Sequence, residues 1–391
     1  MQNYDVVIIG GGVMGAAAAC EVAARGARTA IVDRTLLPNA RAASIDHSKV
    51  FRFAYPDLLY IRMAVESLAL WRKLEYETGE RLLTETGLLM IGHSSPSVET
   101  ATYRILRAEG LEAEMLTAAE TEMRFPQFNG AALSYSVFDP SGAILHAETV
   151  VRALLRLAEE RGVELIEGEA VTSIESESGE PVYVATETGK EIECGCALVA
   201  SGPWTRGLLP ELDDVLYTTR QEVLYFKPAS GDSSFDVSSF PIFFDPGSGF
   251  YGFPVHHAGA MKIANHNKGE PADPDSRNDH VSLRSIGECR AFFADLSPGL
   301  AGAEMVETRV CFYNNTPDDD FIIDWHPELD NVLIATGFSG HGFKFSSLVG
   351  RICAELLSTS QTVFDIERFR LARFGAGLRE SSLLSNPGTE A

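Results

Sequence analysis

The sequence predicts an α/β (α+β) protein of two domains, one built on a parallel sheet and the other on an antiparallel sheet. Three observations predict this architecture. The chain has 391 residues, more than a single hydrophobic core usually serves. It opens with a strand, a glycine-rich turn, a helix and a second strand, whereas its middle holds aromatic and β-branched runs punctuated by Gly and Pro. We therefore expect a Rossmann-type nucleotide-binding domain beside a sheet-based substrate domain.

The opening elements follow from the hydrophobic pattern. Residues 4–9 form a short apolar run that reads as a buried strand, residues 13–25 read as an alanine-rich helix, and residues 29–32 read as a second strand. This order predicts a βαβ unit at the start of the chain.

The pattern G-x-G-x-x-G joins the first strand to the helix. Gly10 permits a tight turn, Gly12 lets a pyrophosphate approach the backbone, and Gly15 lets the helix pack on the strand. The first N–H groups of the helix would then face the phosphates. Asp33, at the end of the second strand, would accept hydrogen bonds from the ribose hydroxyls of an adenosine. The motif alone does not separate FAD from NAD, but its N-terminal position and the discontinuous partner domain favour FAD.

The later elements divide the chain into two kinds of layer. Residues 147–160 have helical spacing and precede a strand, and residues 191–199 read as a buried strand that runs into a loop. The runs 218–228, 240–257 and 260–266 instead favour an antiparallel sheet. The predicted segments are 1–82, 145–212 and 318–375 for the FAD-binding domain, 83–144 and 213–317 for the substrate domain, and 376–391 for a frayed polar tail.

Composition excludes several classes of partner. The formal net charge of −23 repels phosphate backbones and anionic lipids, so we expect neither nucleic acid nor membrane as a partner. No run of about 18 apolar residues could span a bilayer, and the N-terminus lacks a signal-peptide pattern, so we expect a cytoplasmic protein. Six cysteines are too few for a disulfide scaffold, and Cys194 and Cys196 stand too close for a zinc knuckle. We expect no metal.

The segment "CFYNNTPDDDFIIDWHPELDNVLIATGFSGHGFKFSSLVG", residues 311–350, resembles the monomeric sarcosine oxidase and N-methyltryptophan oxidase family of flavin amine oxidases. Residues 51–57, 197–212 and 250–266 resemble the same family and occur in its order. The resemblance implies a glutathione-reductase-like FAD domain with a discontinuous substrate domain. It also implies an FAD-dependent oxidase that attacks the C–N bond of an amino acid or N-alkyl amino acid and reduces O2 to hydrogen peroxide.

The resemblance assigns roles to several side chains. Cys311 matches the cysteine that carries the flavin, although an isolated cysteine in an apolar run is more often a buried hydrophobe. Lys262 matches a lysine assigned to oxygen activation, where a cation stabilises charge developing on oxygen. Arg52 and Lys344 match the pair that holds the substrate carboxylate, the arginine through a bidentate fork and the lysine as a point charge.

Further positions match the substrate pocket and the cofactor site. Three aromatic side chains of the expected pocket are Tyr251, His266 and Tyr313; each could instead be an ordinary packed residue. The glycines of "TGFSGHGFK" would let N–H groups approach a flavin carbonyl. The remaining expected cofactor contacts are Arg34, Ser44, Ser48, Lys49, Val171, Gly202, Trp204, Gly340, Gly342 and Lys344.

The chain departs from the sarcosine-oxidase pattern at "SIDHSKVFR". Ile45 stands where a histidine is usual, and Lys49 stands where an arginine is usual. Asp46 followed three residues later by lysine is similar to the fructosyl-amino-acid oxidase branch, so an Amadori-product oxidase is the alternative function. Asp46 and His47 could also belong to a plain loop that faces solvent.

Other readings stay open at this point. A flavin dehydrogenase that passes electrons to another acceptor and a non-catalytic flavin-binding module are alternatives to the oxidase. The pair His256 and His257 has no third ligand at metal spacing in the sequence, so a surface or packing role is expected for it. The expected partners are a small amino-acid substrate and O2, and the expected state is a monomer, with a dimer as the alternative.

Overall fold

The computed structural model describes residues 2–94, 97–276 and 278–375. Residues 376–391, for which the sequence predicts a frayed tail, lie outside the described part of the chain.

The first sheet is parallel at its centre, in the order β19-β12-β1-β2-β9. Its middle strands are almost wholly buried and rich in Val, Ile and Ala, as expected for strands covered on both faces. β10 and β11 extend it antiparallel beyond β12, and β18 pairs antiparallel with β19. The strand bounds are β1 Gln2–Ile9, β2 Thr29–Asp33, β9 Glu164–Glu167, β10 Val171–Glu175, β11 Val182–Thr186, β12 Glu191–Val199, β18 Ile322–Trp325 and β19 Val332–Thr336.

Helix α1 (Val13–Ala24) packs between this sheet and two other helices, α5 (Ala147–Glu160) and α8 (Ser346–Thr359). Its small side chains explain the close packing. A Cβ placed on Gly350 of α8 would lie 2.6 Å from the backbone carbon of Ala17, so the two helix backbones nearly touch. The alanine-rich composition of α1 therefore reflects contact on several sides.

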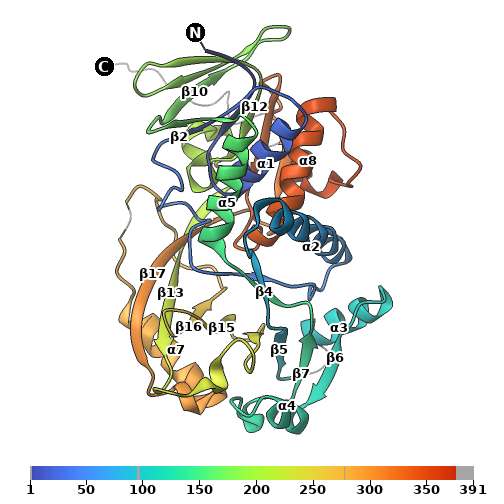
Figure 1. Cartoon of the computed structure of the whole chain (residues 1–391), viewed down its shortest axis with the longest axis vertical. Helices are drawn as coiled ribbons and strands as arrows, with labels where there is room; N and C mark the ends of the chain where they lie inside the picture. The colour runs from blue at the N-terminus through green and yellow to red at the C-terminus, as the bar shows by residue number, and fades with distance from the viewer. Residues whose placement is uncertain (1, 95–96, 277, 376–391) are drawn as a thin grey trace, which may run out of the picture.

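The second sheet has the order β17-β13-β16-β15-β14-β5-β7-β6, and all its neighbours are antiparallel except β14 and β5. It lies below the first sheet in Figure 1, and phenylalanine rings dominate its core. The strand bounds are β5 Leu88–Gly92, β6 Glu114–Thr117, β7 Tyr135–Asp139, β13 Tyr217–Lys227, β14 Ile242–Phe244, β15 Phe250–His257, β16 Ala260–Asn265 and β17 Glu304–Asn315.

A small sheet of β3 (Lys49–Phe51), β8 (Ala143–Leu145) and β4 (Leu83–Glu85) lies where the predicted segments of the two domains meet. It matters because β3 presents Lys49, Phe51 and the chain leading to Arg52 at this junction. The strands of the first sheet all fall inside the segments predicted for the FAD-binding domain, and those of the second sheet fall inside the others.

The remaining helices were not predicted from the sequence. The longest, α2 (Leu58–Thr78), begins at an Asp57 side chain that accepts from the Leu59 N–H and ends at Gly79, whose φ is 68°. Both signals are visible in the sequence. The others are α3 Val98–Ala108, α4 Ala118–Arg124, α6 Thr205–Leu208 and α7 Leu283–Leu296. Among the described helices, none is both long enough and apolar enough to span a bilayer.

Candidate active site

A cavity opens at the carboxyl ends of β1, β2, β12 and β19, where α1 begins. Gly10 has a φ of +105°, and a Cβ there would lie 2.6 Å from the carbonyl oxygen of Ala200. A Cβ on Gly15 would lie 1.9 Å from the carbonyl oxygen of Gly10. Only glycine fits either position, so the turn and the first helical turn form a backbone cradle.

Asp33 anchors this cradle from the neighbouring strand. Its carboxylate accepts hydrogen bonds from the N–H of Gly11 at 2.9 Å and of Thr35 at 3.0 Å. Burial raises the pKa of Asp33 above its ordinary value, while these bonds oppose the shift. The Ser44 hydroxyl accepts from the N–H of Val13 at 3.0 Å, so it holds the start of α1 as well.

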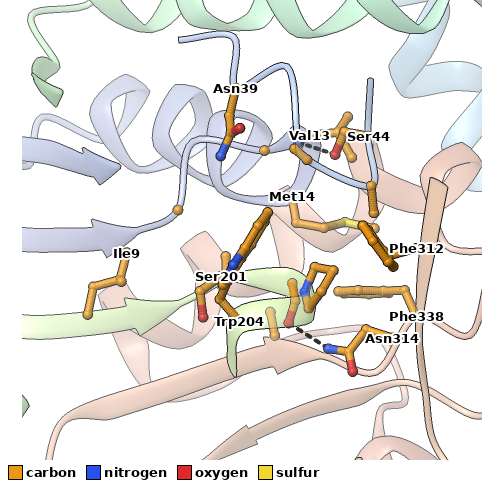
Figure 2. Close-up of a pocket in the computed structure, with 18 of the residues that line it drawn as sticks. Ile9, Val13, Met14, Asn39, Ser44, Ser201, Trp204, Phe312, Asn314 and Phe338 are labelled. Carbon is orange, nitrogen blue, oxygen red and sulfur yellow. Dashed lines mark hydrogen bonds between the residues drawn. The ribbon is translucent and has the colours of Figure 1, made fainter. Parts of the chain in front are cut away.

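Most of the predicted cofactor contacts line this cavity. They are Gly10, Gly12, Asp33, Arg34, Ser44, Lys49, Val171, Gly202, Trp204, Gly340 and Gly342. Gly15, Ser48, Cys311 and Lys344 lie outside its lining. Sequence reasoning missed several other side chains that Figure 2 shows around the cavity, including Met14, Asn39, Ser201, Asn314 and Phe338.

A second, smaller cavity of about 80 Å³ adjoins the first and shares Lys49, Tyr313, Gly340 and Phe343 with it. All six side chains that the resemblance assigned to catalysis line it: Arg52, Tyr251, Lys262, His266, Tyr313 and Lys344. Its other walls are apolar, with Leu88, Ile242, Phe243 and Phe244 among them. The cavity therefore gathers four basic side chains, Lys49, Arg52, Lys262 and Lys344, against walls that are partly apolar.

Arg52 and Lys344 are organised around Tyr55. The Arg52 guanidinium lies 4.3 Å from the Tyr55 ring centre and donates to the carbonyl oxygen of Ala54 at 2.6 Å. Lys344 Nζ donates to the Tyr55 hydroxyl at 2.9 Å and to the carbonyl oxygen of His341 at 2.7 Å. Burial and the nearby Arg52 charge lower the pKa of Lys344 well below its ordinary value. An anion between the two cations would reverse that shift.

Tyr55 and His341 were missed in the sequence, although both stand inside the quoted motifs "FRFAYPD" and "SGHGFK". The Tyr55 hydroxyl lies 3.3 Å from His341 Nδ1, and the His341 ring also contacts the buried Phe321. Proximity in sequence to Arg52 and Lys344 was the available signal.

Lys262 is buried with its charge paired. Its exposed fraction is 1%, and its Nζ donates to Asp46 Oδ2 at 2.6 Å and to the carbonyl oxygen of Ser48 at 2.7 Å. Burial lowers the pKa of Lys262 to about 8, while the Asp46 charge opposes that shift. Lys49 Nζ lies 3.5 Å from the same carboxylate oxygen.

Asp46 does not face solvent, which corrects one of the readings of the "SIDHS" loop. It is 2% exposed, and it also accepts a hydrogen bond from the Tyr225 hydroxyl at 2.6 Å. Burial alone would raise the pKa of Asp46, but Lys262 and Lys49 hold it far below its ordinary range. His47 is also largely covered, because its ring packs edge-on against Tyr225 and stacks on His257.

Cys311 lies on β17, beside the charged group that Asp46, Lys49 and Lys262 form. Its Sγ is 3.9 Å from Lys49 Nζ and 3.5 Å from the carbonyl oxygen of Ala43, and the thiol is partly exposed. Burial alone would lower the pKa of Lys49, but Cys311 and Asp46 raise it above its ordinary value. Lys49 is therefore a cation held beside the Cys311 sulfur.

Three aromatic side chains form one wall of the small cavity. The Tyr313 hydroxyl lies 3.5 Å from His266 Nδ1, and the Tyr251 and His266 rings meet edge to face at 6.4 Å. Burial, with Arg52 and Lys344 nearby, lowers the pKa of His266 to about 4, so its ring is neutral at physiological pH. A Cβ on Gly340 would lie 2.3 Å from the Tyr313 ring, so this glycine lets the ring approach the loop.

The large cavity fits a dinucleotide on observations of this chain. The backbone cradle, the start of α1 and Asp33 match the needs of phosphates and a ribose. Asn314 Oδ1, on a residue that lines the cavity, is buried and has no hydrogen-bond partner among the described residues. The fold and the site together define a flavin-dependent oxidoreductase.

Comparison with known proteins identifies the family. Residues 5–356 match the family described as FAD dependent oxidoreductase, and the chain belongs to it. The chain is 34% identical over 388 residues to monomeric sarcosine oxidase from Bacillus sp. (strain B-0618), which covers 97% of this chain and 98% of that protein. It is 30% identical over 380 residues to N-methyl-L-tryptophan oxidase from Citrobacter koseri, covering 95% and 100%.

Solved structures share the fold. NikD, described as an unusual amino acid oxidase essential for nikkomycin biosynthesis, superposes with a TM-score of 0.81 at 25% identity and covers 95% of this chain and 98% of its own. Fructosyl amine: oxygen oxidoreductase (Amadoriase I) from Aspergillus fumigatus superposes with a TM-score of 0.79 at 20% identity, covering 94% and 89%. The expected resemblance and the expected fold class are thus confirmed.

Proposed function

We propose that this enzyme is an FAD-dependent oxidase of N-substituted amino acids. It removes one hydrogen from the carbon bound to the substrate nitrogen and one from that nitrogen to give an imine, and the two electrons and two protons reduce O2 to H2O2. One observation carries the proposal: Arg52 and Lys344 converge, with Lys262, on one small cavity that adjoins the dinucleotide cradle. The names of the two relatives, a sarcosine oxidase and an N-methyltryptophan oxidase, support the same substrate class.

The flavin, when bound, would accept a hydride equivalent, two electrons and one proton, from the carbon beside the substrate nitrogen. The chain's own residues bind and orient the substrate. Arg52 offers a bidentate fork to a carboxylate, and Lys344 adds a point charge on the other side. The apolar walls exclude water and fit a small N-alkyl group. The neutral His266 adds no further positive charge beside the amine.

The oxygen step depends on Lys262. A positive charge fixed in a water-poor site stabilises the negative charge that develops as O2 accepts electrons. Its partners, Asp46 and the Ser48 carbonyl, keep the ammonium group charged and in place. This arrangement favours an oxidase over a dehydrogenase that uses another acceptor.

We further propose that Cys311 carries the flavin covalently. The support is its position, since the Cys311 Sγ lies 3.9 Å from Lys49 Nζ and Lys49 lines the cavity that fits the dinucleotide. A cytoplasmic location and a monomeric state stay predictions.

An Amadori-product oxidase is the second candidate. Asp46 and Lys49 favour it, since they lie 3.5 Å apart where sarcosine-type members have a different pattern. The names of the two relatives, a sarcosine oxidase and an N-methyl-L-tryptophan oxidase, favour N-methyl amino acids over sugar-derived amines.

An anaerobic substrate screen tests the proposal. Sarcosine, other N-methyl amino acids, cyclic imino acids, fructosyl amino acids and free amino acids would each be mixed with the oxidised enzyme while flavin bleaching is followed. We expect bleaching by N-methyl amino acids and peroxide on admitting air. Bleaching by amines without a carboxylate alone would contradict the roles of Arg52 and Lys344, and bleaching without peroxide in air would indicate a dehydrogenase.

A matched pair of variants sharpens the result. Lys344→Met should raise the KM for a carboxylate substrate strongly, because it removes a cation from the cavity. Lys268→Met, which removes a partly exposed cation outside that cavity lining, should leave the KM near the wild-type value.

A further inference from the structure

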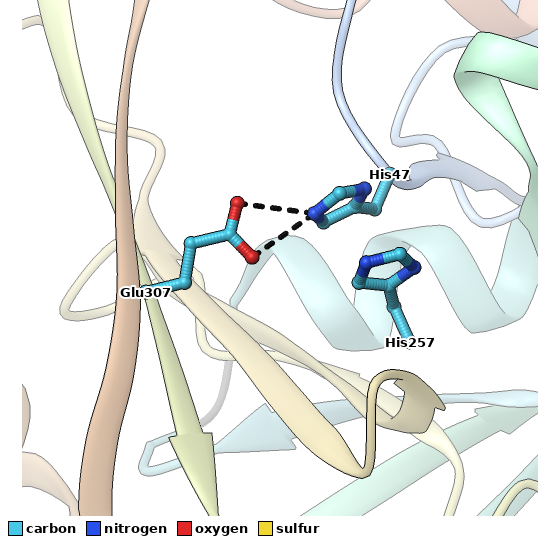
Figure 3. Close-up of side chains that lie close together, drawn as sticks. All are labelled: His47, His257 and Glu307. Atoms are coloured by element: carbon cyan, nitrogen blue, oxygen red, sulfur yellow. Dashed lines mark hydrogen bonds and ion pairs between the residues drawn. The ribbon is translucent and has the colours of Figure 1, made fainter.

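Three side chains of metal-ligand type converge outside the two cavities just described. They are His47, in the loop before β3, His257, at the end of β15, and Glu307, on β17. One ligand atom of each lies within 4.8 Å of the others. Figure 3 shows the Glu307 carboxylate directed at the His47 ring, with the His257 ring alongside. The sequence analysis found no third ligand near the His256 and His257 pair, because its partners come from distant segments.

The hydrogen bonding around His47 Nε2 is contradictory. Both carboxylate oxygens of Glu307 lie 3.1 Å from this nitrogen, and Arg309 Nη2 lies 2.9 Å from it. An imidazole nitrogen either donates or accepts, so it cannot satisfy a carboxylate and a guanidinium together. If it carries a proton it opposes the N–H of Arg309, and if it does not it opposes the carboxylate. A metal ion resolves the conflict, because a cation accepts lone pairs from both His47 and Glu307.

The stacked rings favour the same conclusion. The His47 and His257 ring centres are 3.4 Å apart, with 17° between the planes. The stacking holds the His257 ring beside the His47 ring, so a third side chain of ligand type stands next to the His47 and Glu307 pair.

We propose that His47, His257 and Glu307 form a binding site for a divalent transition-metal ion, with Zn²⁺ as the reference ion. Two imidazoles and one carboxylate, with water at a fourth position, form a ligand set found in open zinc sites. The spread of 4.8 Å requires a small side-chain rotation to bring all three atoms to about 2 Å from one ion. Glu307 also lines a cavity of about 300 Å³, so its carboxylate can be reached from that side.

Arg309 sets the strength of the site. Its Nε donates to Glu307 Oε1 at 2.6 Å, a bond that can persist behind a carboxylate that ligates through Oε2. Its Nη2 must leave His47 when the ion enters, and its charge opposes the ion. Its side chain is 30% exposed, so it has room to turn away. The site should therefore be weak and readily exchangeable.

Zn²⁺ binding to the flavin-loaded enzyme tests the proposal. After treatment with a chelator, the wild type should take up one Zn²⁺ per chain in calorimetric titration, and Co²⁺ should give a visible spectrum that added Zn²⁺ removes. His257→Gln and Glu307→Gln should each weaken binding about tenfold or more. Arg309→Gln should bind Zn²⁺ more tightly than the wild type. His280→Gln, which alters an exposed histidine outside the cluster, should change nothing.

Each outcome decides the matter. A wild type without one-to-one uptake, or with uptake that survives both His257→Gln and Glu307→Gln, overturns the proposal, and the cluster is then only a hydrogen-bonded tie between β17 and the loop before β3. Binding that is no tighter in Arg309→Gln contradicts the role given to the guanidinium. The Zn²⁺ titration of the wild type can refute the proposal by itself, so the test remains decisive even if a variant does not fold.

Discussion

We predict that the buried ion pair of Asp46 and Lys262 controls the rate at which O2 reoxidises the reduced flavin. With Asp46 present, burial lowers the pKa of Lys262 to about 8, so at pH 7 the charged form is favoured roughly tenfold. Asp46→Asn keeps the shape and removes the charge. The two groups are in contact, and an ion pair with its charge centres about 4 Å apart contributes on the order of 4 kcal/mol at an effective dielectric constant of 20. The neutral form would then be favoured by about 3 kcal/mol, roughly a hundredfold.

The assay mixes the anaerobically reduced enzyme with oxygenated buffer and follows the return of oxidised flavin absorbance. At pH 7, Asp46→Asn should slow flavin reoxidation by up to about a hundredfold, and the reoxidation rate should not fall below that of the Lys262→Met variant. Flavin reduction by substrate should change little. Tyr225→Phe is the matched control, since it removes the other hydrogen bond to Asp46 without changing charge. Reoxidation at the wild-type rate in Asp46→Asn, with Lys262→Met slow, would refute the reasoning.

Further predictions follow from other parts of the site. The wild-type reoxidation rate should fall as the pH rises through about 8, because Lys262 loses its proton there, whereas flavin reduction should rise because the substrate amine must be neutral; pH profiles of the two half-reactions check this. Substrate binding should take up a proton at Lys344, whose pKa is low in the free chain and rises beside a carboxylate; calorimetry in two buffers of different ionisation enthalpy measures it, and no buffer dependence would count against it. Acid-precipitated wild type should stay yellow and Cys311→Ala should release its flavin; colourless wild-type precipitate would mean a non-covalent flavin. Gly15→Ala should purify without flavin, because its Cβ would lie 1.9 Å from a carbonyl oxygen, and normal flavin content would contradict the cradle.

The nucleotide-binding layer could be predicted because its signals are local. The run of Gly10, Gly12 and Gly15 sits between a strand and a helix within 33 residues, and every element of that unit was expected within one or two residues. The resemblance then named side chains that the structure brings into one small cavity, although they come from distant segments.

The failures share a physical cause. The polar loop "SIDHS" looks exposed because its burial depends on Lys262, which stands more than two hundred residues later and supplies the opposite charge. The neighbours of His257 were hidden for the same reason, since His47 and Glu307 arrive on other segments. The pairing of β5 with β14 also joins distant segments, and neither helix propensity nor periodicity predicts it.

The alternation of side chains along strand β17 limits which kinds of mutation the enzyme can accept. Side chains on a strand alternate between its two faces, and Glu307, Arg309, Cys311 and Tyr313 stand two residues apart in one row. That row runs from the histidine cluster, past the thiol, to the wall of the substrate cavity. Inserting or deleting one residue within β17 would turn part of the row to the opposite face at once. A single substitution in β17 therefore leaves the other side chains of the row on the same face, whereas an insertion or a deletion does not.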